Sequence, residues 1–260
     1  MEVSWQHRLW GGESLFDVFR QQVIPASPDV LWACLTDPSR LRQWFADIAV
    51  LALDQPFRFD FGDGDFFVGK VTAWREGRRL DLDWRFMGLG PVFRIRIYLT
   101  PAGEGTEVTV HDRGALTLAE VESLRFGWQD FLGRLAAHAG SGRNARYRWS
   151  ETIGLGALLP SAGGRLPELA EADWWRQAFP AATVECRPVR PATVLATFEE
   201  PSWDQPTEAL VETLVGEFGT FVAVTHRGWN DLAEAARITH RTRYAGLWQR
   251  CLSDLEELYR

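Results

Sequence analysis

Hydrophobic and polar residues alternate along three segments in the first half of the chain. Each segment is expected to form a strand with one face toward a core and the other toward water. Turn-forming residues such as Gly62-Asp63-Gly64 separate the segments, which predicts an antiparallel meander with hairpin connections. The apolar positions of the three segments are Phe57, Phe59 and Phe61, then Leu80, Leu82, Trp84 and Phe86, then Phe93, Ile95, Ile97 and Leu99.

Helical spacing replaces this alternation on both sides of the meander. Ser27-Pro28-Asp29 and Asp37-Pro38-Ser39 each combine a capping residue with a proline, which predicts two short helices before the strands. After a last strand over residues 106–110, apolar residues recur on one helical face between Leu118 and Leu135. A sheet with one dry face followed by a long amphipathic helix predicts an α+β domain in which the curved sheet wraps around that helix.

The junction between the last strand and the long helix occurs twice in the chain. Residues 105–121 (GTEVTVHDRGALTLAEV) align without gaps with residues 219–235 (GTFVAVTHRGWNDLAEA), and nine of the 17 positions are identical. Chance supplies about one match at typical composition, so we interpret the match as an internal repeat. We therefore predict one such α+β domain over residues 1–140 and a degenerate second copy of it over residues 145–260.

The second copy is expected to have lost or shortened strands, because its upstream part matches the first copy poorly. The glycine-containing stretch over 140–144 is the expected linker. The elements expected in the second copy are a strand over 147–153, short helices within 166–179, and strands over 184–187 and 193–198.

Composition adds a heavy aromatic load, with 13 Trp and 16 Phe against four Tyr. These rings fill a core or line a pocket. The formal net charge of −7 argues against a nucleic-acid partner or an anionic membrane surface, both of which call for a basic face. We expect a cytoplasmic protein, since the chain shows neither a signal peptide nor a run of 18 apolar residues. Lys70 is the only lysine, and this preference for arginine suggests an actinobacterial source.

The sequence offers no catalytic constellation, so no catalytic residue, metal or cofactor is assigned. Phosphate-binding loops, zinc-protease helices and serine-hydrolase elbows are missing from the sequence. Cys34, Cys186 and Cys251 lie far apart in apolar segments, which fits reduced core thiols better than a metal cage. The five histidines are scattered, and His111 falls on the predicted wet face of its strand.

Several short motifs together resemble the helix-grip superfamily, also called SRPBCC, which includes START, Bet v 1-like and polyketide cyclase domains. The resemblance is to the branch named after the activator of Hsp90 ATPase homologue, and it covers about residues 16–138. The second half is similar to the family only from about residue 190. The motifs, in the family's order, are Pro25-Ala26-Ser27-Pro28, Leu35-Thr36-Asp37-Pro38, Leu41-x-x-Trp44-Phe45, Gly69-Lys70-Val71, Leu80-x-x-x-Trp84, Leu99-Thr100-Pro101, Gly105-Thr106-Glu107-Val108 and Gly127-Trp128.

The resemblance implies a ligand cavity between the sheet and the long helix. The alternative is that the same residues only fill a core. The candidate ligand-binding residues are Trp44, Phe59, Phe61, Trp84, Phe86, Phe93, Ile95, Trp128, Phe131 and Leu132.

Three classes of function are compatible with this picture. The first is binding or sequestration of a hydrophobic small molecule, such as an enediyne or another polyketide, because the chain is similar to START-domain proteins of enediyne self-resistance. The second is a polyketide aromatase or cyclase, which would need polar residues on the dry faces, and few are visible there. The third is a protein-interaction module of the cochaperone kind. We expect a monomer in which the second copy packs on the first.

Overall fold

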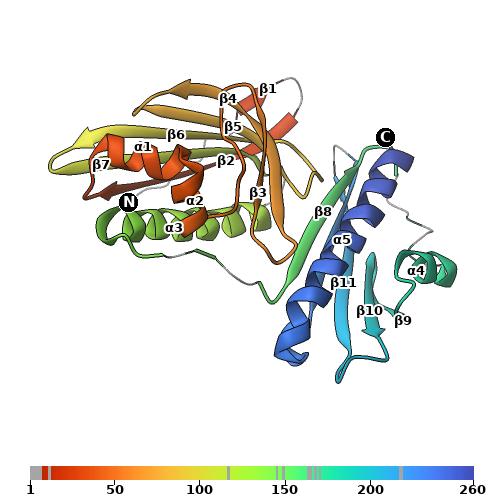
Figure 1. Cartoon of the computed structure of the whole chain (residues 1–260). Coiled ribbons are helices and arrows are strands. Elements are labelled where there is room, and N and C mark those ends of the chain that lie inside the picture. Colours follow the sequence, from red (N-terminus) through yellow and green to blue (C-terminus); the bar gives the residue numbers. More distant parts are fainter. Residues whose placement is uncertain are drawn as a thin grey trace. The chain divides into compact units, whose positions relative to one another are not determined.

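The chain forms two compact units in a computed structural model (Figure 1). The first unit consists of the described residues up to Phe61 and of Phe66–Tyr147, and the second consists of Gly62–Asp65 and of the described residues after Tyr147. The second unit therefore includes a turn that lies, along the chain, between two strands of the first. The structure describes residues 8–10, 13–115, 118–144, 146–147, 150–162, 166, 169, 171–216 and 219–260.

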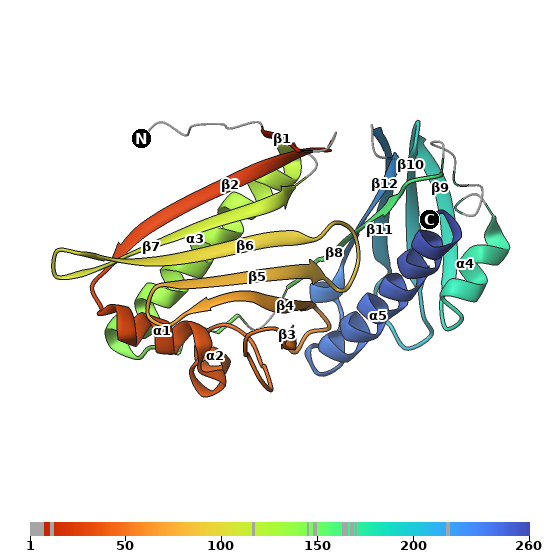
Figure 2. The same ribbon diagram turned by 90° about the horizontal axis from the view of Figure 1, so that it is seen from above.

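In the first unit, a seven-stranded antiparallel sheet packs against one long helix, α3 (Leu118–Ser141), as Figures 1 and 2 show. The strands lie in the order β1-β2-β7-β6-β5-β4-β3, so that consecutive strands from β3 to β7 are joined as hairpins. The strand bounds are β1 Arg8–Trp10, β2 Glu13–Ile24, β3 Pro56–Asp60, β4 Phe66–Arg75, β5 Arg79–Phe86, β6 Phe93–Ala102 and β7 Gly105–Ala115.

Two short helices, α1 (Pro28–Thr36) and α2 (Pro38–Trp44), connect β2 to β3. Both begin as the sequence predicts. The Val30 backbone N–H donates to the Ser27 hydroxyl at 3.4 Å, and the Ser39 backbone N–H donates to Asp37 Oδ1 at 2.8 Å. Each bond satisfies a backbone donor that has no partner within its own helix, which fixes where the helix starts.

The core of the first unit confirms the predicted alternation. The inward residues of β3, β5 and β6 are buried except for Phe86 and Phe93, which are half-buried, whereas Arg94 and Arg96 on the outer face of β6 are exposed. The helix contributes one apolar face to the same core. Buried residues of this core are Phe57, Phe59, Leu80, Leu82, Trp84, Ile95, Ile97 and Leu99 from the strands, and Val121, Trp128, Phe131, Leu132 and Leu135 from α3.

The second unit repeats this plan with fewer strands. A five-stranded antiparallel sheet, in the order β8-β12-β11-β10-β9, packs against the long helix α5 (Glu234–Leu258), seen clearly in Figure 2. Its other elements are β8 Ile153–Leu159, α4 Ala172–Ala178, β9 Thr183–Arg190, β10 Thr193–Glu199, β11 Thr207–Gly216, β12 Gly219–Arg227 and the 3-10 turn η2 Trp229–Asp231.

Both the chain order and the sheet order match between the two units. The strands β8, β12, β11, β10 and β9 occupy the positions of β2, β7, β6, β5 and β4. Counterparts of β1 and β3 are missing from the described part of the second unit. The protein is thus an α+β fold of two helix-grip copies, and the expected reduction of the second sheet is confirmed.

Some details of the second copy differ from the predictions. Of the strand expected over 147–153, residues 148–149 lie outside the described residues, and the described strand starts at Ile153. Just before it, the carbonyls of Ser150 and Thr152 accept hydrogen bonds from Arg241 rather than from a neighbouring strand. The helices expected within 166–179 reduce to α4, with residues 167–168 and 170 outside the described residues. Cys186 is exposed, so the expectation of three core thiols is wrong there, because β9 is an edge strand.

Candidate functional site

A small apolar cavity of about 20 Å³ lies inside the first unit, between its sheet and its helices. A single water needs roughly 10–15 Å³, whereas ligand pockets span about 300–1,000 Å³. In this state the interior is therefore almost filled by side chains. The lining residues are Leu35, Leu41, Phe45, Phe59, Leu80, Leu82, Trp84, Ile97, Trp128 and Phe131.

A stack of three aromatic rings crosses from the sheet to the helix beside this cavity. The ring of Phe67 on β4 stacks on Trp84 of β5, with centroids 4.4 Å apart and planes inclined by 22°. Trp84 in turn lies parallel to Trp128 of α3, with centroids 5.9 Å apart and planes inclined by 5°. Flat, parallel ring faces of this kind are the surface on which another aromatic ring packs well.

The structure brings four of the ten candidate residues together around the cavity. Trp44 does not line the cavity but packs on one of these four residues. Its ring packs on Phe131 at 4.9 Å between centroids, and its Nε1–H donates to the Cys34 carbonyl at 3.0 Å, which holds α2 against α1. The four lining candidates are Phe59, Trp84, Trp128 and Phe131.

The remaining candidates do not line the cavity. Ile95 and Leu132 are buried in the adjoining core. Phe61, Phe86 and Phe93 are half-buried, so solvent reaches part of each ring.

Six lining residues were not among the candidates, although the pattern carried a signal for most of them. Leu80, Leu82 and Ile97 occupy the predicted dry faces, and Phe45 directly follows the candidate Trp44.

Asp112 is a buried carboxyl group on the inner face of the sheet. It lies on β7 between Val18 of β2 and Ile95 of β6, and it is 1% exposed. The Trp128 indole Nε1–H donates to Asp112 Oδ2 at 2.7 Å. Among the described residues, Asp112 Oδ1 has no hydrogen-bond partner.

The surroundings of Asp112 favour its protonated form. Burial raises the pKa of this carboxyl to about 7, and the negative charge of Asp17 acts in the same direction against the opposing hydrogen bond from Trp128. Sequence reasoning missed this residue even though the alternation of Val108, Val110 and Asp112 places it on the dry face. The neighbouring His111 is exposed, as its position on the predicted wet face indicates.

His226 occupies the position of Asp112 in the repeat, 114 residues later in the chain. It is fully buried, and its Nδ1 accepts a hydrogen bond from the Trp248 indole Nε1–H at 2.9 Å. Its Nε2 therefore carries the proton and donates to the Thr207 hydroxyl, 2.8 Å away. Burial, helped by the charge of Arg241, holds the pKa of His226 well below its usual value. The ring is neutral and both of its nitrogens are used.

The interior of the second unit is packed with aromatic rings around His226. Phe198 lies 4.7 Å and Trp229 4.5 Å from the histidine ring, measured between centroids. A polar hollow of about 460 Å³ lies on the surface of this unit. Its lining residues are Glu151, Thr152, Arg227, Gly228, Asn230 and Asp231.

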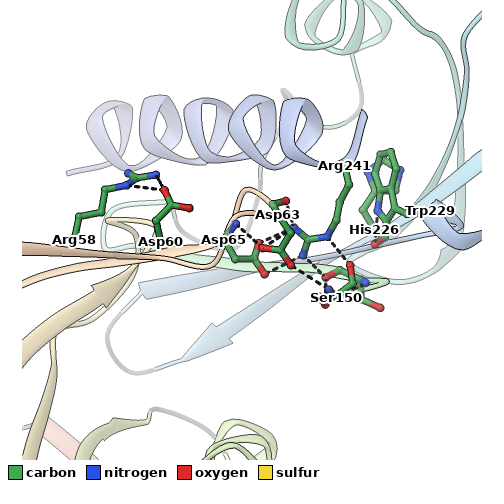
Figure 3. Close-up of polar contacts among 9 residues, drawn as sticks. Arg58, Asp60, Asp63, Asp65, Ser150, His226, Trp229 and Arg241 are labelled. Carbon is green, nitrogen blue, oxygen red and sulfur yellow. Dashed lines mark hydrogen bonds and ion pairs between the residues drawn. The ribbon is translucent and has the colours of Figure 1, made fainter. Parts of the chain in front are cut away.

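A buried arginine holds the turn over residues 62–65 within the second unit, as Figure 3 shows. Arg241 of α5 has no exposed surface, and all five of its N–H donors are used. Two go to the Asp65 carboxylate at 2.9 and 3.0 Å, and three go to the carbonyls of Asp63, Ser150 and Thr152 at 2.6–2.8 Å. This arrangement compensates the buried charge completely.

The described residues contain no cluster of three or more side chains suited to holding a metal ion. None of the described helices combines the length and the apolar character that crossing a membrane requires.

Comparisons with known proteins place these features in a family. The family model described as activator of Hsp90 ATPase homolog 1-like protein matches residues 25–140. A comparison with curated protein sequences gave no match.

Three solved structures illustrate the range of similarity. CalU16 from Micromonospora echinospora is 21% identical with a TM-score of 0.46, covering 54% of this chain and 87% of its own. CV1439 from Chromobacterium violaceum is 22% identical with a TM-score of 0.43, covering 47% of this chain and 96% of its own. DynU16, described as a protein in the dynemicin biosynthetic locus, is 31% identical with a TM-score of 0.84, covering 94% of this chain and 99% of its own. The chain therefore belongs, with DynU16, to the activator of Hsp90 ATPase homologue 1-like branch of the helix-grip superfamily.

Proposed function

We propose that the first unit binds a hydrophobic, aromatic small molecule between its sheet and α3, and that the second unit has a mainly structural role. The observation that carries the proposal is the aromatic lining of the cavity, with Trp84 and Trp128 in parallel. The ligand would enter by displacing side chains, because the cavity has room for about one water. Phe45, Phe61 and Phe67 are half-buried, so moving one of them exposes less apolar surface than moving a fully buried ring.

The ligand class that fits best is a secondary metabolite with fused rings, of the polyketide or enediyne kind. DynU16, the relative of matching length, is described as a protein in the dynemicin biosynthetic locus. By analogy, the role of this chain would be sequestration of such a compound, as self-resistance or as an accessory to biosynthesis. The hollow on the second unit is lined by polar residues, which supports placing an apolar ligand in the first.

Titration of the full chain with a panel of polycyclic aromatic polyketides tests this proposal. Binding is expected to shift the indole Nε1–H resonances of Trp84 and Trp128 and to quench tryptophan fluorescence. The variant Leu82→Phe fills the cavity and is expected to weaken binding at least tenfold. The matched control Leu214→Phe, at an exposed position of β11, should bind as the natural chain does. If no compound moves either indole resonance, the proposal fails.

A second candidate function is catalysis of the aromatase or cyclase kind, and Asp112 is the observation that favours it. A buried carboxyl with a pKa of about 7 is suited to exchange a proton with an enolising substrate near neutral pH. Product analysis with a poly-β-ketone substrate tests this function. Identical product distributions with the natural chain, with Asp112→Asn and without protein would reject it.

A further inference from the structure

We infer that Asp112 is the polar contact of the binding site in the first unit, and that its Oδ1 forms a hydrogen bond with a hydroxyl group carried by an otherwise apolar aromatic ligand. The inference rests on the proposed function and adds the chemistry that the ligand must have.

The position of Asp112 places it next to the cavity lining. Its Oδ2 accepts from the indole of Trp128, whose ring lines the cavity and stacks on Trp84. Its strand neighbours Val18 and Ile95 are apolar and buried. A ligand ring that separates the two indoles would therefore come close to a carboxyl group that has one oxygen free.

The free oxygen calls for an explanation, because buried polar atoms without a partner are rare and destabilise the fold. The repeat provides an internal comparison. His226, at the equivalent position of the second unit, also accepts from a helix indole, but its other nitrogen donates to Thr207. The second unit thus satisfies both polar atoms of this side chain, and the first unit, which holds the apolar cavity, satisfies one.

A hydroxyl group is the ligand group that fits this oxygen. It donates to a carboxylate and accepts from a carboxylic acid, so it pairs with Asp112 in either protonation state. A site with a buried polar atom also discriminates strongly against an analogue that lacks the matching group, because that atom then stays without a partner.

A matched pair of probes tests the inference on the full chain: 2-naphthol, and 2-methylnaphthalene, which replaces the hydroxyl by a methyl group of similar size. We expect 2-naphthol to bind at least about tenfold more tightly, which is the effect of one hydrogen bond to a buried polar group. Both probes should shift the indole resonance of Trp84, since both rings occupy the same cavity.

The variant Asp112→Leu is expected to reduce the preference for 2-naphthol over 2-methylnaphthalene to less than about twofold. A shift of the Trp84 indole resonance with both probes reports that the cavity of the variant is intact. The control Asp83→Leu, on the opposite face of the sheet, should keep the preference. Should Asp112→Leu fail to fold, infrared difference spectra replace it. Binding of 2-naphthol, but not of 2-methylnaphthalene, should then shift a carboxyl band that is missing in Asp112→Asn.

The outcomes separate the inference from the proposed function. Equal affinities for the two probes, with cavity resonances moving in both cases, overturn the role of Asp112 and leave the proposed function standing. If neither probe binds, both the role of Asp112 and the proposed function are overturned.

Discussion

The indole Nε1–H of Trp128 donates to Asp112 Oδ2 at 2.7 Å, and both side chains are buried in the first unit. In the second unit the Trp248 indole makes the corresponding bond to His226 Nδ1 at 2.9 Å. Both copies thus connect the last strand to the long helix through one buried polar contact. The acceptor is a carboxyl group in the first unit and an imidazole ring in the second, so we expect the two contacts to make stability depend on pH in opposite directions.

The first prediction concerns the energetic coupling of Trp128 and Asp112. Trp128→Phe leaves Asp112 Oδ2 without its donor, which should lower the free energy of unfolding by about 1–3 kcal/mol beyond the loss of packing. In an Asp112→Leu background the same tryptophan change should cost only its packing share. Chemical denaturation of the four species of this double-mutant cycle measures the coupling. Additive effects would show that the hydrogen bond contributes nothing.

The second prediction concerns the pH dependence that Asp112 imparts. Its pKa is raised from 3.8 to about 7 in the folded protein, by burial and by Asp17 of β2 against the bond from Trp128 of α3, while β6 presents the uncharged Ile95. Between these two pH values the folded state holds a proton that the unfolded chain has released. The contribution to stability is therefore present below pH 4 and is lost as the pH rises to 7, by at most about 4 kcal/mol.

Unfolding free energies of the natural chain and of Asp112→Asn, compared from pH 4.5 to pH 7.5, test this. The natural chain should lose stability relative to the variant as the pH rises. A constant difference over this range contradicts the prediction.

The third prediction has the opposite sign and concerns His226. Its pKa is depressed by burial and by the charge of Arg241, while its other contacts, Thr207 and Trp248, are uncharged. Below the ordinary histidine pKa near 6.5, the unfolded chain binds a proton that the folded chain excludes. Stability should therefore fall as the pH drops through 6.5, by roughly 1.4 kcal/mol per pH unit at most.

The variant His226→Gln provides the reference, because its amide can accept from Trp248 and donate to Thr207 without titrating. Nitrogen NMR should also show His226 protonated on Nε2 at pH 5. A doubly protonated ring at that pH would refute the assignment.

The fourth prediction compares two arginine–aspartate pairs drawn in Figure 3. Arg241→Met removes the buried partner of Asp65 and should destabilise the chain by about 3–5 kcal/mol. Arg58→Met, which removes the exposed pair with Asp60, should cost less than about 1 kcal/mol. Thermal or chemical unfolding of both variants measures the contrast. Equal effects would mean that the five hydrogen bonds of Arg241 do not stabilise the second unit.

The sequence predicted the strands and helices of the first unit closely, because alternation and capping residues act locally. The caps at Ser27 and Asp37 and the inward residues of β5 are examples. The long-range features were not predicted from local patterns. Nothing in the sequence around Asp63 and Asp65 indicates that an arginine 176 positions beyond Asp65 surrounds them, since such a partner depends on how distant segments pack.

For the candidate site, the sequence indicated which faces are dry but not how much space they leave. Phe59, Trp84, Trp128 and Phe131 do surround one cavity, yet its size depends on how closely the helix approaches the sheet. The sequence pattern could have identified Asp112 as a candidate, because a single polar residue on a predicted dry strand face is itself a signal.

The turn over residues 62–65 has a consequence for how this tandem could evolve. A duplicated copy is ordinarily free to be deleted or moved as one continuous gene segment. Here the second copy uses four residues encoded within the first, and loss of the first would leave Arg241 buried without the carboxylate of Asp65. The two copies are therefore constrained to be inherited as one gene, even if only one of them keeps a ligand.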